Sequence, residues 1–321
     1  SLSNRSVHWE RSEQMDLGFD LGLLNNRFSL ELDYYRRDTK DMLVTVDVPA
    51  SVGLTPVETN VGAVRNSGVD FTVKWEDSLK DFRYGIRLTG TTIKNEVISL
   101  GGKRIASGDI GAGKSVQMTE EGKPIKYFYG YNVIGIFQNE AQIKEYNERA
   151  AAATGNAGQQ YQNNVGPGDL IYEDVDGDGY ITANDRQDLG SPTPQFISAS
   201  WKGFDLSIDF QGNFGNKIFN AKQVERFSGS DNWDRSFLDR WTPENPNTMT
   251  PRMTLEGNNY QVSSRYVESG SYVKLQTAEL GYTFPKSWMQ KVSVQNLRVY
   301  FSGNNLAYFT GYNGFTPEVL G

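Results

Sequence analysis

The side chains of this chain alternate between apolar and polar over long stretches, and this period of two restricts the fold more than any other feature. Apolar residues occupy every second position from Met15 to Leu23 and from Val69 to Trp75. Successive side chains of a β-strand point to opposite faces of a sheet, so each such segment has one apolar and one polar face. The sequence therefore predicts an all-β, antiparallel fold, with helical spacing only at about residues 140–153.

The alternation predicts eight strands along the chain. They cover about residues 13–23, 27–40, 62–76, 82–94, 195–201, 204–214, 271–284 and 294–306. Within the seventh, the apolar parity shifts near Gln276 and Thr277. One inserted residue produces such a shift, so we expect a β-bulge there.

Short and long connections alternate between these strands. The short ones lie at 25–26, 77–81, 202–203 and 285–293, and the long ones at about 41–61, 95–194 and 215–270. Transmembrane β-barrels have this asymmetry, with short periplasmic turns and long extracellular loops. A β-sandwich more often has turn signals at even spacing on both sides. Aromatic residues near the short turns agree with an interfacial girdle. The predicted fold is an antiparallel transmembrane β-barrel segment.

Residues 174–185 form an acidic, glycine-rich loop of the kind that wraps around a hard cation. Four aspartates supply side-chain oxygens, Tyr180 supplies a backbone carbonyl at position seven, and the Thr182 hydroxyl at position nine could hold a water. The candidate metal ligands are therefore Asp174, Asp176, Asp178, Tyr180, Thr182 and Asp185. Ca²⁺ takes about six to eight oxygen ligands, and Mg²⁺ accepts a similar set in stricter octahedral geometry. We expect a structural Ca²⁺ site, with Mg²⁺ as the alternative ion. The other interpretation is an acidic turn that binds no ion.

This loop differs from that of an EF-hand in two respects. Its last ligand is Asp185, where the EF-hand has a bidentate Glu. Gly166, Pro167 and Gly168 interrupt the chain upstream, so no helix leads into the loop. We therefore expect a loop stapled by its ion and no opening of a helix pair.

Composition excludes several classes of function. The chain has no Cys, and His8 is its only histidine, so thiolate chemistry is excluded and a His-based triad or metal site is disfavoured. The net charge of −7 argues against nucleic acid as the main partner. An extracellular glycoside hydrolase needs two carboxylates paired across a cleft. Because the sequence gives no means of pairing them, we expect no enzymatic activity.

Several stretches resemble one known family. They include Asn66-Ser67-Gly68-Val69, the segment from Pro167 through the acidic loop to Pro192, Gly270-Ser271-Tyr272-Val273-Lys274-Leu275 and Gly303-Asn304-Asn305-Leu306. In these the chain is similar to the C-terminal part of SusC/RagA-type TonB-dependent outer-membrane transporters of Bacteroidetes. The similarity extends over nearly all of residues 1–321, as one part of the barrel domain. Family members are longer, with an N-terminal plug and a 22-stranded barrel, so we expect the plug and the final strand to be absent here.

The resemblance implies a function and a set of partners. Such transporters import glycans, and in some cases peptides, across the bacterial outer membrane with energy passed through TonB. A SusD-like lipoprotein covers the barrel from outside. The implied partners are the remainder of the barrel and plug, that lipoprotein, TonB through the missing N-terminal part, outer-membrane lipid and an oligosaccharide or peptide. The alternative from the residues alone is a secreted calcium-binding carbohydrate-binding or adhesion module, soluble and with a closed sheet.

The second long connection supplies candidate contacts with a substrate or lid. Its aromatic residues lie among many Asn, Ser and Asp residues and are Phe227, Trp233, Phe237, Trp241 and Tyr260. Aromatic faces beside amides are suited to sugar stacking or to a hydrophobic lid. The other interpretation is that these side chains only hold a long loop together.

Overall fold

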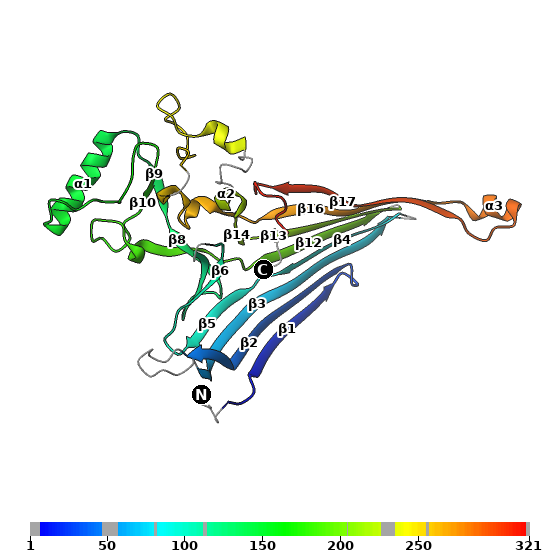
Figure 1. Cartoon of the computed structure of the whole chain (residues 1–321). Coiled ribbons are helices and arrows are strands. Elements are labelled where there is room, and N and C mark those ends of the chain that lie inside the picture. Colours follow the sequence, from blue (N-terminus) through cyan, green and yellow to red (C-terminus); the bar gives the residue numbers. More distant parts are fainter. Residues whose placement is uncertain are drawn as a thin grey trace.

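One large antiparallel sheet dominates the computed structural model, which describes residues 7–46, 57–79, 82–111, 114–203, 205–225, 235–254 and 257–318. In spatial order its strands are β1 (Arg11–Leu23), β2 (Phe28–Val46), β3 (Val57–Leu79), β4 (Phe82–Thr91), β12 (Gln195–Gly203), β13 (Leu206–Phe214), β16 (Tyr272–Thr283) and β17 (Arg298–Thr310). A ninth strand, β5 (Lys94–Leu100), pairs with β3 outside this path. The path is open, with β1 and β17 at its ends (Figure 1). The eight strands that the sequence predicts are the eight strands of this spatial order, from β1 to β17. The predicted fold class is therefore confirmed.

Apolar residues lie opposite apolar residues across the sheet. The aligned pairs include Phe19 with Leu32, Leu32 with Phe71, Val73 with Leu88, Trp201 with Ile86, Ile208 with Trp201, and Leu280 with Phe301. Many of these side chains are exposed, Leu17 to 71% and Phe301 to 81%. Among the described residues, no second layer packs on this face. The opposite face carries polar residues in the same register, among them Glu31, Thr72, Thr89, Ser198 and Gln211.

Local irregularities occur where the sequence predicts them. The register of β16 shifts against β17 between Leu275 and Thr277, which confirms the expected bulge. In the turn between β1 and β2, Leu24, Asn25 and Asn26 have positive φ angles of 55°, 57° and 62°. Asn adopts this left-handed region more readily than most residues.

Two of the predicted connections differ in the structure. β2 and β3 stay paired as far as Val46 and Val57, so both described ends of the expected long loop at about 41–61 are strand, and residues 47–56 lie outside the described residues. Strand pairing is a backbone interaction, and it continues where the apolar alternation stops. β4 ends at Thr91, and the chain from Lys94 pairs with the outer part of β3 as β5.

The two longest connections contain secondary structure of their own. The first holds β6 (Ile105–Asp109), β7 (Ser115–Thr119), β8 (Tyr127–Tyr131), β9 (Val133–Ile136), α1 (Glu140–Thr154), β10 (Leu170–Tyr172), η2 (Ala183–Asp185) and β11 (Arg186–Gly190). The second holds β14 (Lys217–Phe219), α2 (Lys222–Glu225), η3 (Arg235–Asp239), η4 (Asn258–Tyr260), η5 (Ser264–Tyr266) and β15 (Val267–Ser269). Figure 1 shows both at one end of the sheet, whereas α3 (Lys286–Met289) and η6 (Gln290–Val292) lie at the other.

These two connections pack together, and we call their described residues within 101–190 and 215–270 the loop body. The Tyr131 amide donates to the Val262 carbonyl at 2.9 Å, and the Leu170 amide donates to Asn259 Oδ1 at 2.9 Å. The Trp241 indole donates to Gln138 Oε1 at 3.0 Å. The loop body therefore has its own core and is more than a pair of surface loops.

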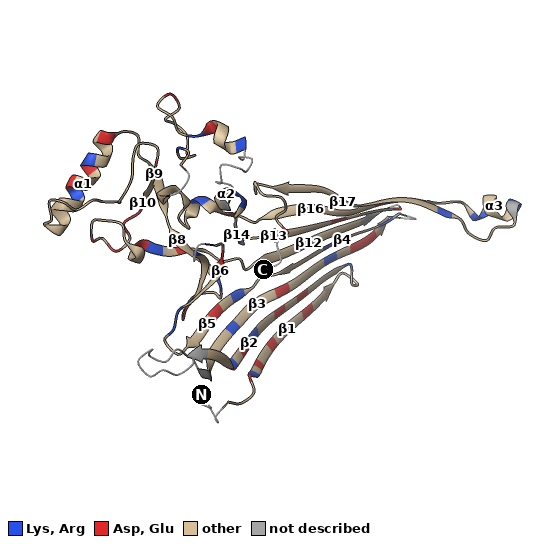
Figure 2. Cartoon of the chain, viewed as in Figure 1, with Lys and Arg blue, Asp and Glu red and all other residues tan. Residues whose placement is uncertain are grey.

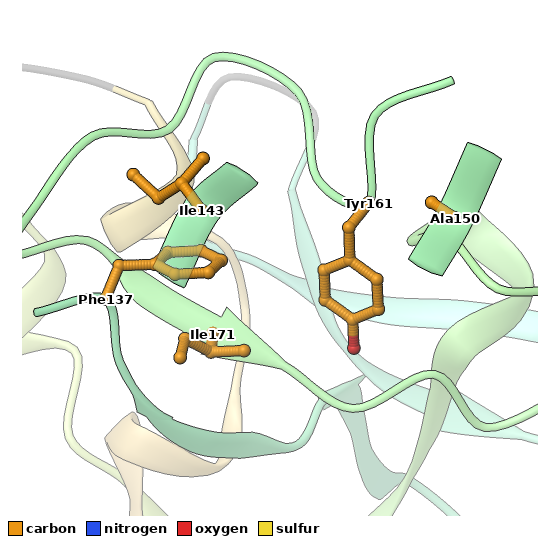
Figure 3. Close-up of a cluster of buried hydrophobic side chains, with 5 residues drawn as sticks. All are labelled: Phe137, Ile143, Ala150, Tyr161 and Ile171. Atoms are coloured by element: carbon orange, nitrogen blue, oxygen red, sulfur yellow. The ribbon is translucent and has the colours of Figure 1, made fainter. Parts of the chain in front are cut away.

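Helix α1 confirms the only helical segment that the sequence predicts. The Asn139 side chain caps its first turn by accepting from the Gln142 amide at 2.9 Å, and Gly155 ends it with φ 70°. Its buried face contributes to a cluster of Phe137, Ile143, Ala150, Tyr161 and Ile171 (Figure 3). No helix in the described parts of the chain is long and apolar enough to span a membrane.

Candidate metal centre and the loop body

The acidic loop brings three of its four carboxylates together. Ligand oxygens of Asp174, Asp176 and Asp185 all lie within 4.8 Å of one another. Asp178 lies outside this group, and its Oδ1 accepts instead from the Tyr180 amide at 3.1 Å. Like charges at this separation repel one another unless a cation offsets them. The convergence agrees with the spacing argument for these three residues.

Asp185 is the most constrained member of the group. Its side chain is fully buried, and no Lys or Arg of the described chain forms an ion pair with it. Oδ1 accepts from the Val175 amide at 2.8 Å, and Oδ2 accepts from the Thr182 amide at 2.7 Å. The bond from the Thr182 amide is one half of a capping box at the start of η2. Because a buried carboxylate is costly without a positive partner, this donor set fits a hard cation.

The remaining predicted ligands contribute to the loop in other ways. Tyr180 packs beside the buried cluster shown in Figure 3. The Thr182 hydroxyl accepts from the Asn184 amide at 3.0 Å and lies 3.4 Å from Asp185 Oδ2. Coordination by the Tyr180 carbonyl, and by a water held at Thr182, stays a prediction.

Backbone geometry fixes the loop against α1. Gly177 and Gly179 have φ angles of 75° and 93°, which side chains disfavour. A Cβ on Gly179 would lie 2.6 Å from the Ala153 Cβ, whereas one on Gly177 would meet nothing within 4 Å. Gly179 is therefore needed both for the turn and for the close approach to the helix.

Tyr161 lies next to this loop and connects it to the core. Its hydroxyl donates to the Tyr172 carbonyl at 2.6 Å. Burial, with the nearby Asp174 charge as a smaller cause, raises the pKa of Tyr161 to about 12. The phenol is therefore neutral at physiological pH and acts here as a hydrogen-bond donor.

The described aromatic candidates for substrate or lid contact are inside the loop body. Phe237, Trp241 and Tyr260 expose only 7%, 8% and 5% of their surface. Trp241 packs with Ile136 and Leu170, so its ring is not offered to a partner in this structure. Phe227 and Trp233 lie outside the described residues. A contact role for these aromatics stays a prediction, and the described geometry favours a packing role for the three.

A buried polar cluster that the sequence does not indicate joins the two connections. Asp169, only 3% exposed, accepts from Arg252 Nε at 2.6 Å and from Arg252 Nη2 at 2.8 Å. The Asn259 amide donates to the same carboxylate at 2.8 Å. The hydrogen bond to Asp169 raises the pKa of the Arg252 guanidinium above its usual value. Asp169 and Arg252 are 83 residues apart, so no local spacing marks them as partners.

Comparison with known proteins places the chain in one family. Residues 1–117 match the model of the TonB dependent receptor-like β-barrel family. TonB-dependent receptor P3 of Formosa agariphila is 32% identical over 99% of this chain and 31% of that protein. TonB-dependent receptor SusC of Bacteroides thetaiotaomicron is 24% identical over 98% of this chain and 30% of that protein.

Solved structures give the same assignment. The RagAB peptide importer in its open-open state aligns with a TM-score of 0.73 and 25% identity, covering 98% of this chain and 33% of that one. Its closed-closed state aligns with a TM-score of 0.71 and 26% identity, covering 99% of this chain and 34% of that one. The chain thus spans about a third of the length of the relatives that it matches. It belongs to the β-barrel part of the TonB-dependent receptor family, in the SusC/RagA type.

Proposed function

We propose that this chain forms part of the wall of a transporter that imports glycans or peptides across the bacterial outer membrane. The observation that carries the proposal is the two-faced sheet, with an exposed apolar belt on one side and a polar lining on the other. Lipid stabilises such a belt, and a wet lumen stabilises the polar face. The RagAB neighbours are described as a peptide importer, which supports a peptide as one candidate substrate.

The orientation of the sheet is tested by cysteine labelling in the complete protein. This chain has no native Cys, so single Cys substitutions at Leu21 and Asp20 report on adjacent positions of opposite parity. We expect a water-soluble maleimide to label position 20 and a lipid-soluble reagent to label position 21. Labelling with the opposite pattern would overturn the assignment of the two faces.

The alternative of a secreted, soluble calcium-binding module requires a closed sheet with its apolar face covered. The path from β1 to β17 is open, and Phe301, on the strand at one end, is 81% exposed. An uncovered apolar face of this size disfavours a soluble protein. The observations therefore favour the transporter.

The loop body is the proposed docking surface for a SusD-like lipoprotein lid outside the membrane. Its support is position, since both long connections lie at the same end of the sheet while the short ones lie at the other. TonB and the plug would act through parts of the protein beyond this chain. Uptake of labelled oligosaccharides and peptides by cells, with and without the transporter gene, tests the transport proposal and its substrate class. Equal uptake by both strains would contradict it.

We also propose that the acidic loop binds Ca²⁺ as a structural ion. The convergent oxygens of Asp174, Asp176 and Asp185 support this proposal. Asp178, Tyr180 and Thr182 are proposed as further ligands from their places in the loop. In calorimetric titration of the purified full-length protein we expect one Ca²⁺ site at these residues, with Mg²⁺ bound more weakly. No change in Ca²⁺ binding on Asp174→Asn with Asp185→Asn would place the ion elsewhere.

A further inference from the structure

Charged side chains follow directly on the apolar belt at the end of the sheet that carries the loop body. On β2 the belt runs from Phe28 to Tyr34 at every second position, and the next residues of the same parity are Arg36, Asp38 and Lys40. Figure 2 shows basic and acidic residues on β2, β3 and β5 toward the end of the sheet away from α3. Because parity fixes the face, these charges lie on the same side of the sheet as the belt.

Three cations on this face surround one small polar side chain. Arg36 on β2 and Lys94 on β5 both lie opposite Ser67 on β3. Arg65 lies two residues from Ser67 on β3 and therefore shares its face. The Ser67 hydroxyl forms no hydrogen bond with any residue that the structure describes. We call Arg36, Arg65, Ser67 and Lys94 the rim site.

Asp38 holds two of these cations in a fixed orientation. Its carboxylate accepts from Nε and Nη2 of Arg65 at 2.8 and 3.1 Å, and from Nε and Nη2 of Arg36 at 3.4 and 2.8 Å. One carboxylate therefore serves two guanidiniums, and one positive charge is left over. Each guanidinium has five N–H donors, so both keep Nη1 donors for a further acceptor.

Lys94 adds a cation that is open to a ligand. It pairs with Glu96 at 3.0 Å, yet its side chain is 76% exposed. Exposed pairs of this kind contribute little, because water screens them and both side chains lose freedom. The ammonium group can therefore turn to an anion beside Ser67 at small cost.

The rim site lies at the height expected for lipid headgroups. On β1 the belt runs from Met15 to Leu23, and a tilted strand of this length rises roughly 20 Å, close to the height of about 25 Å of a barrel's apolar band. Met15 lies opposite Arg36, so the rim site begins where the belt ends. Charges on this face cost little near the membrane interface, in contrast to the midplane.

Other described parts of the rim differ from this sector. On β16 and β17 the same face stays apolar as far as Val273 and Phe309, which lie opposite each other. At the short-turn end of β2 and β3, Phe28 lies opposite Trp75, as in an aromatic girdle. The rim site is therefore a local feature of β2, β3 and β5, as a binding site requires.

We propose that the rim site binds a phosphate group of an anionic glycolipid in the outer leaflet of the membrane. Phosphate offers acceptor oxygens and negative charge to Arg36, Arg65 and Lys94, and guanidinium forks match such oxygens in pairs. The Ser67 hydroxyl supplies one further donor. This inference goes beyond transport and needs only the proposed placement of the belt in lipid.

Binding of lipid A to the purified full-length transporter tests the proposal. Monophosphoryl lipid A is titrated into the delipidated protein in neutral detergent and the bound fraction is measured by native mass spectrometry. Dephosphorylated lipid A is the matched ligand, since it has the same acyl chains. We expect the wild-type protein to prefer the phosphorylated lipid.

Arg36→Gln combined with Lys94→Gln removes both cations opposite Ser67 and leaves Arg65 to neutralise Asp38. Each basic residue near an anionic lipid surface strengthens binding about fivefold, so the double variant should bind monophosphoryl lipid A about 25-fold more weakly. Binding of the dephosphorylated lipid should not change.

Lys123→Gln is the control variant. Lys123 is an exposed cation of the loop body that pairs with Asp188, so its loss changes the net charge equally per site but leaves the rim site intact. It should bind both lipids as the wild type does.

Three results would overturn the proposal. Undiminished binding in the double variant would remove the assigned residues, and equal binding of the two lipids would show that the acyl chains suffice. Normal lipid binding with a changed oligomeric mass in light scattering would assign this surface to another protein copy. Heat-modifiability, in which folded barrels migrate faster on gels, checks that the double variant is folded. If it is not, Lys94→Gln alone carries the test, with an expected fivefold loss, and cysteine labelling at positions 20 and 21 separates these results from a wrong orientation of the sheet.

Discussion

At the residue scale, Asp185 combines structural and ligand roles in one carboxylate. Its oxygens hold the amides of Val175 and Thr182, and they face Asp174 and Asp176 across the candidate site. Substitution of Asp185 can separate these two roles. Asn keeps an acceptor and loses the charge, whereas Ala loses both.

We expect Asp185→Asn to abolish measurable Ca²⁺ binding with only a modest loss of stability. Asp185→Ala should destabilise the loop body further, by about 1–3 kcal/mol, because two amides lose their acceptor. Asp178→Asn is the matched control and should weaken Ca²⁺ binding less, since Asp178 lies outside the convergent group. Calorimetric titration and thermal unfolding measure the two effects. Wild-type affinity in Asp185→Asn would contradict the site.

The two glycines of the acidic loop give a second prediction at this scale. Gly177→Ala places a Cβ in open space, so only the left-handed backbone opposes it, at a cost of about 1 kcal/mol. Gly179→Ala has the same backbone cost, and its added Cβ would also collide with the Cβ of Ala153. We expect Gly179→Ala to increase protease cleavage within 166–194 well above Gly177→Ala. Equal cleavage would show that the loop does not depend on its contact with α1.

At the scale of elements, the parity of each strand decides which substitutions the sheet tolerates. Val73 lies between Leu30 and Leu88 on the apolar belt, and Thr72 lies between Glu31 and Thr89 on the polar face. We expect Val73→Arg to reduce the folded, membrane-inserted fraction, since a cation near the lipid midplane costs about 2–4 kcal/mol. Thr72→Arg should insert normally because its neighbour Glu31 is acidic. Heat-modifiability of outer-membrane fractions compares them, and equal insertion of both variants would contradict the register.

The Asp169–Arg252 pair gives a prediction for the two connections as packed elements. Arg252→Met leaves the Asp169 carboxylate buried without its cation, and breaking a buried pair costs about 3–5 kcal/mol. We expect the lower end of this range because the Arg252 side chain is 41% exposed. Asp169→Asn added to Arg252→Met removes the stranded charge and should recover part of the loss. Protease resistance of the loop body in the single and double variants measures this, and no recovery would mean that the charge is not the cause.

At the scale of the whole molecule, the sheet and the loop body should respond separately to metal removal. The candidate ion lies in the loop body, while the strands are held by their own backbone pairing. We expect a chelator to expose residues around 166–194 to protease and to leave the heat-modifiable mobility of the barrel unchanged. Re-adding Ca²⁺ should restore protection. Equal cleavage with and without chelator would show that the loop is ordered without an ion.

Exposed side chains of the loop body can be tested for lid docking without disturbing its core. Removing residues 228–260 would remove the buried Trp241 and Tyr260 along with any docking surface. Such a variant loses its core, so lost lid binding would not identify a contact. Substitution of the exposed Leu238 and Met249 by Ser tests the same surface without disturbing the packing, since these side chains are 79% and 62% exposed.

The sequence by itself determined the features that depend on neighbouring residues. Alternation gave the eight strands of the main path and the bulge near Gln276, but not β5, because parity is a local property of a strand. The spacing of the acidic loop named its candidate ligands, because one chain segment supplies them all. Asn139 and Gly155 bound helix α1 where the apolar spacing predicted a helix.

Only the tertiary structure decided what depends on distant partners. The burial of Trp241 and Tyr260, the pairing of Asp169 with Arg252, and the continued pairing of β2 with β3 follow from contacts between segments far apart in sequence. The opposition of like charges, Asp20 against Glu31 and Asp33 against Asp70, likewise appears only in the register of the paired strands. A strand pattern shows which face a residue takes, and only the pairing of strands shows which charge lies opposite it.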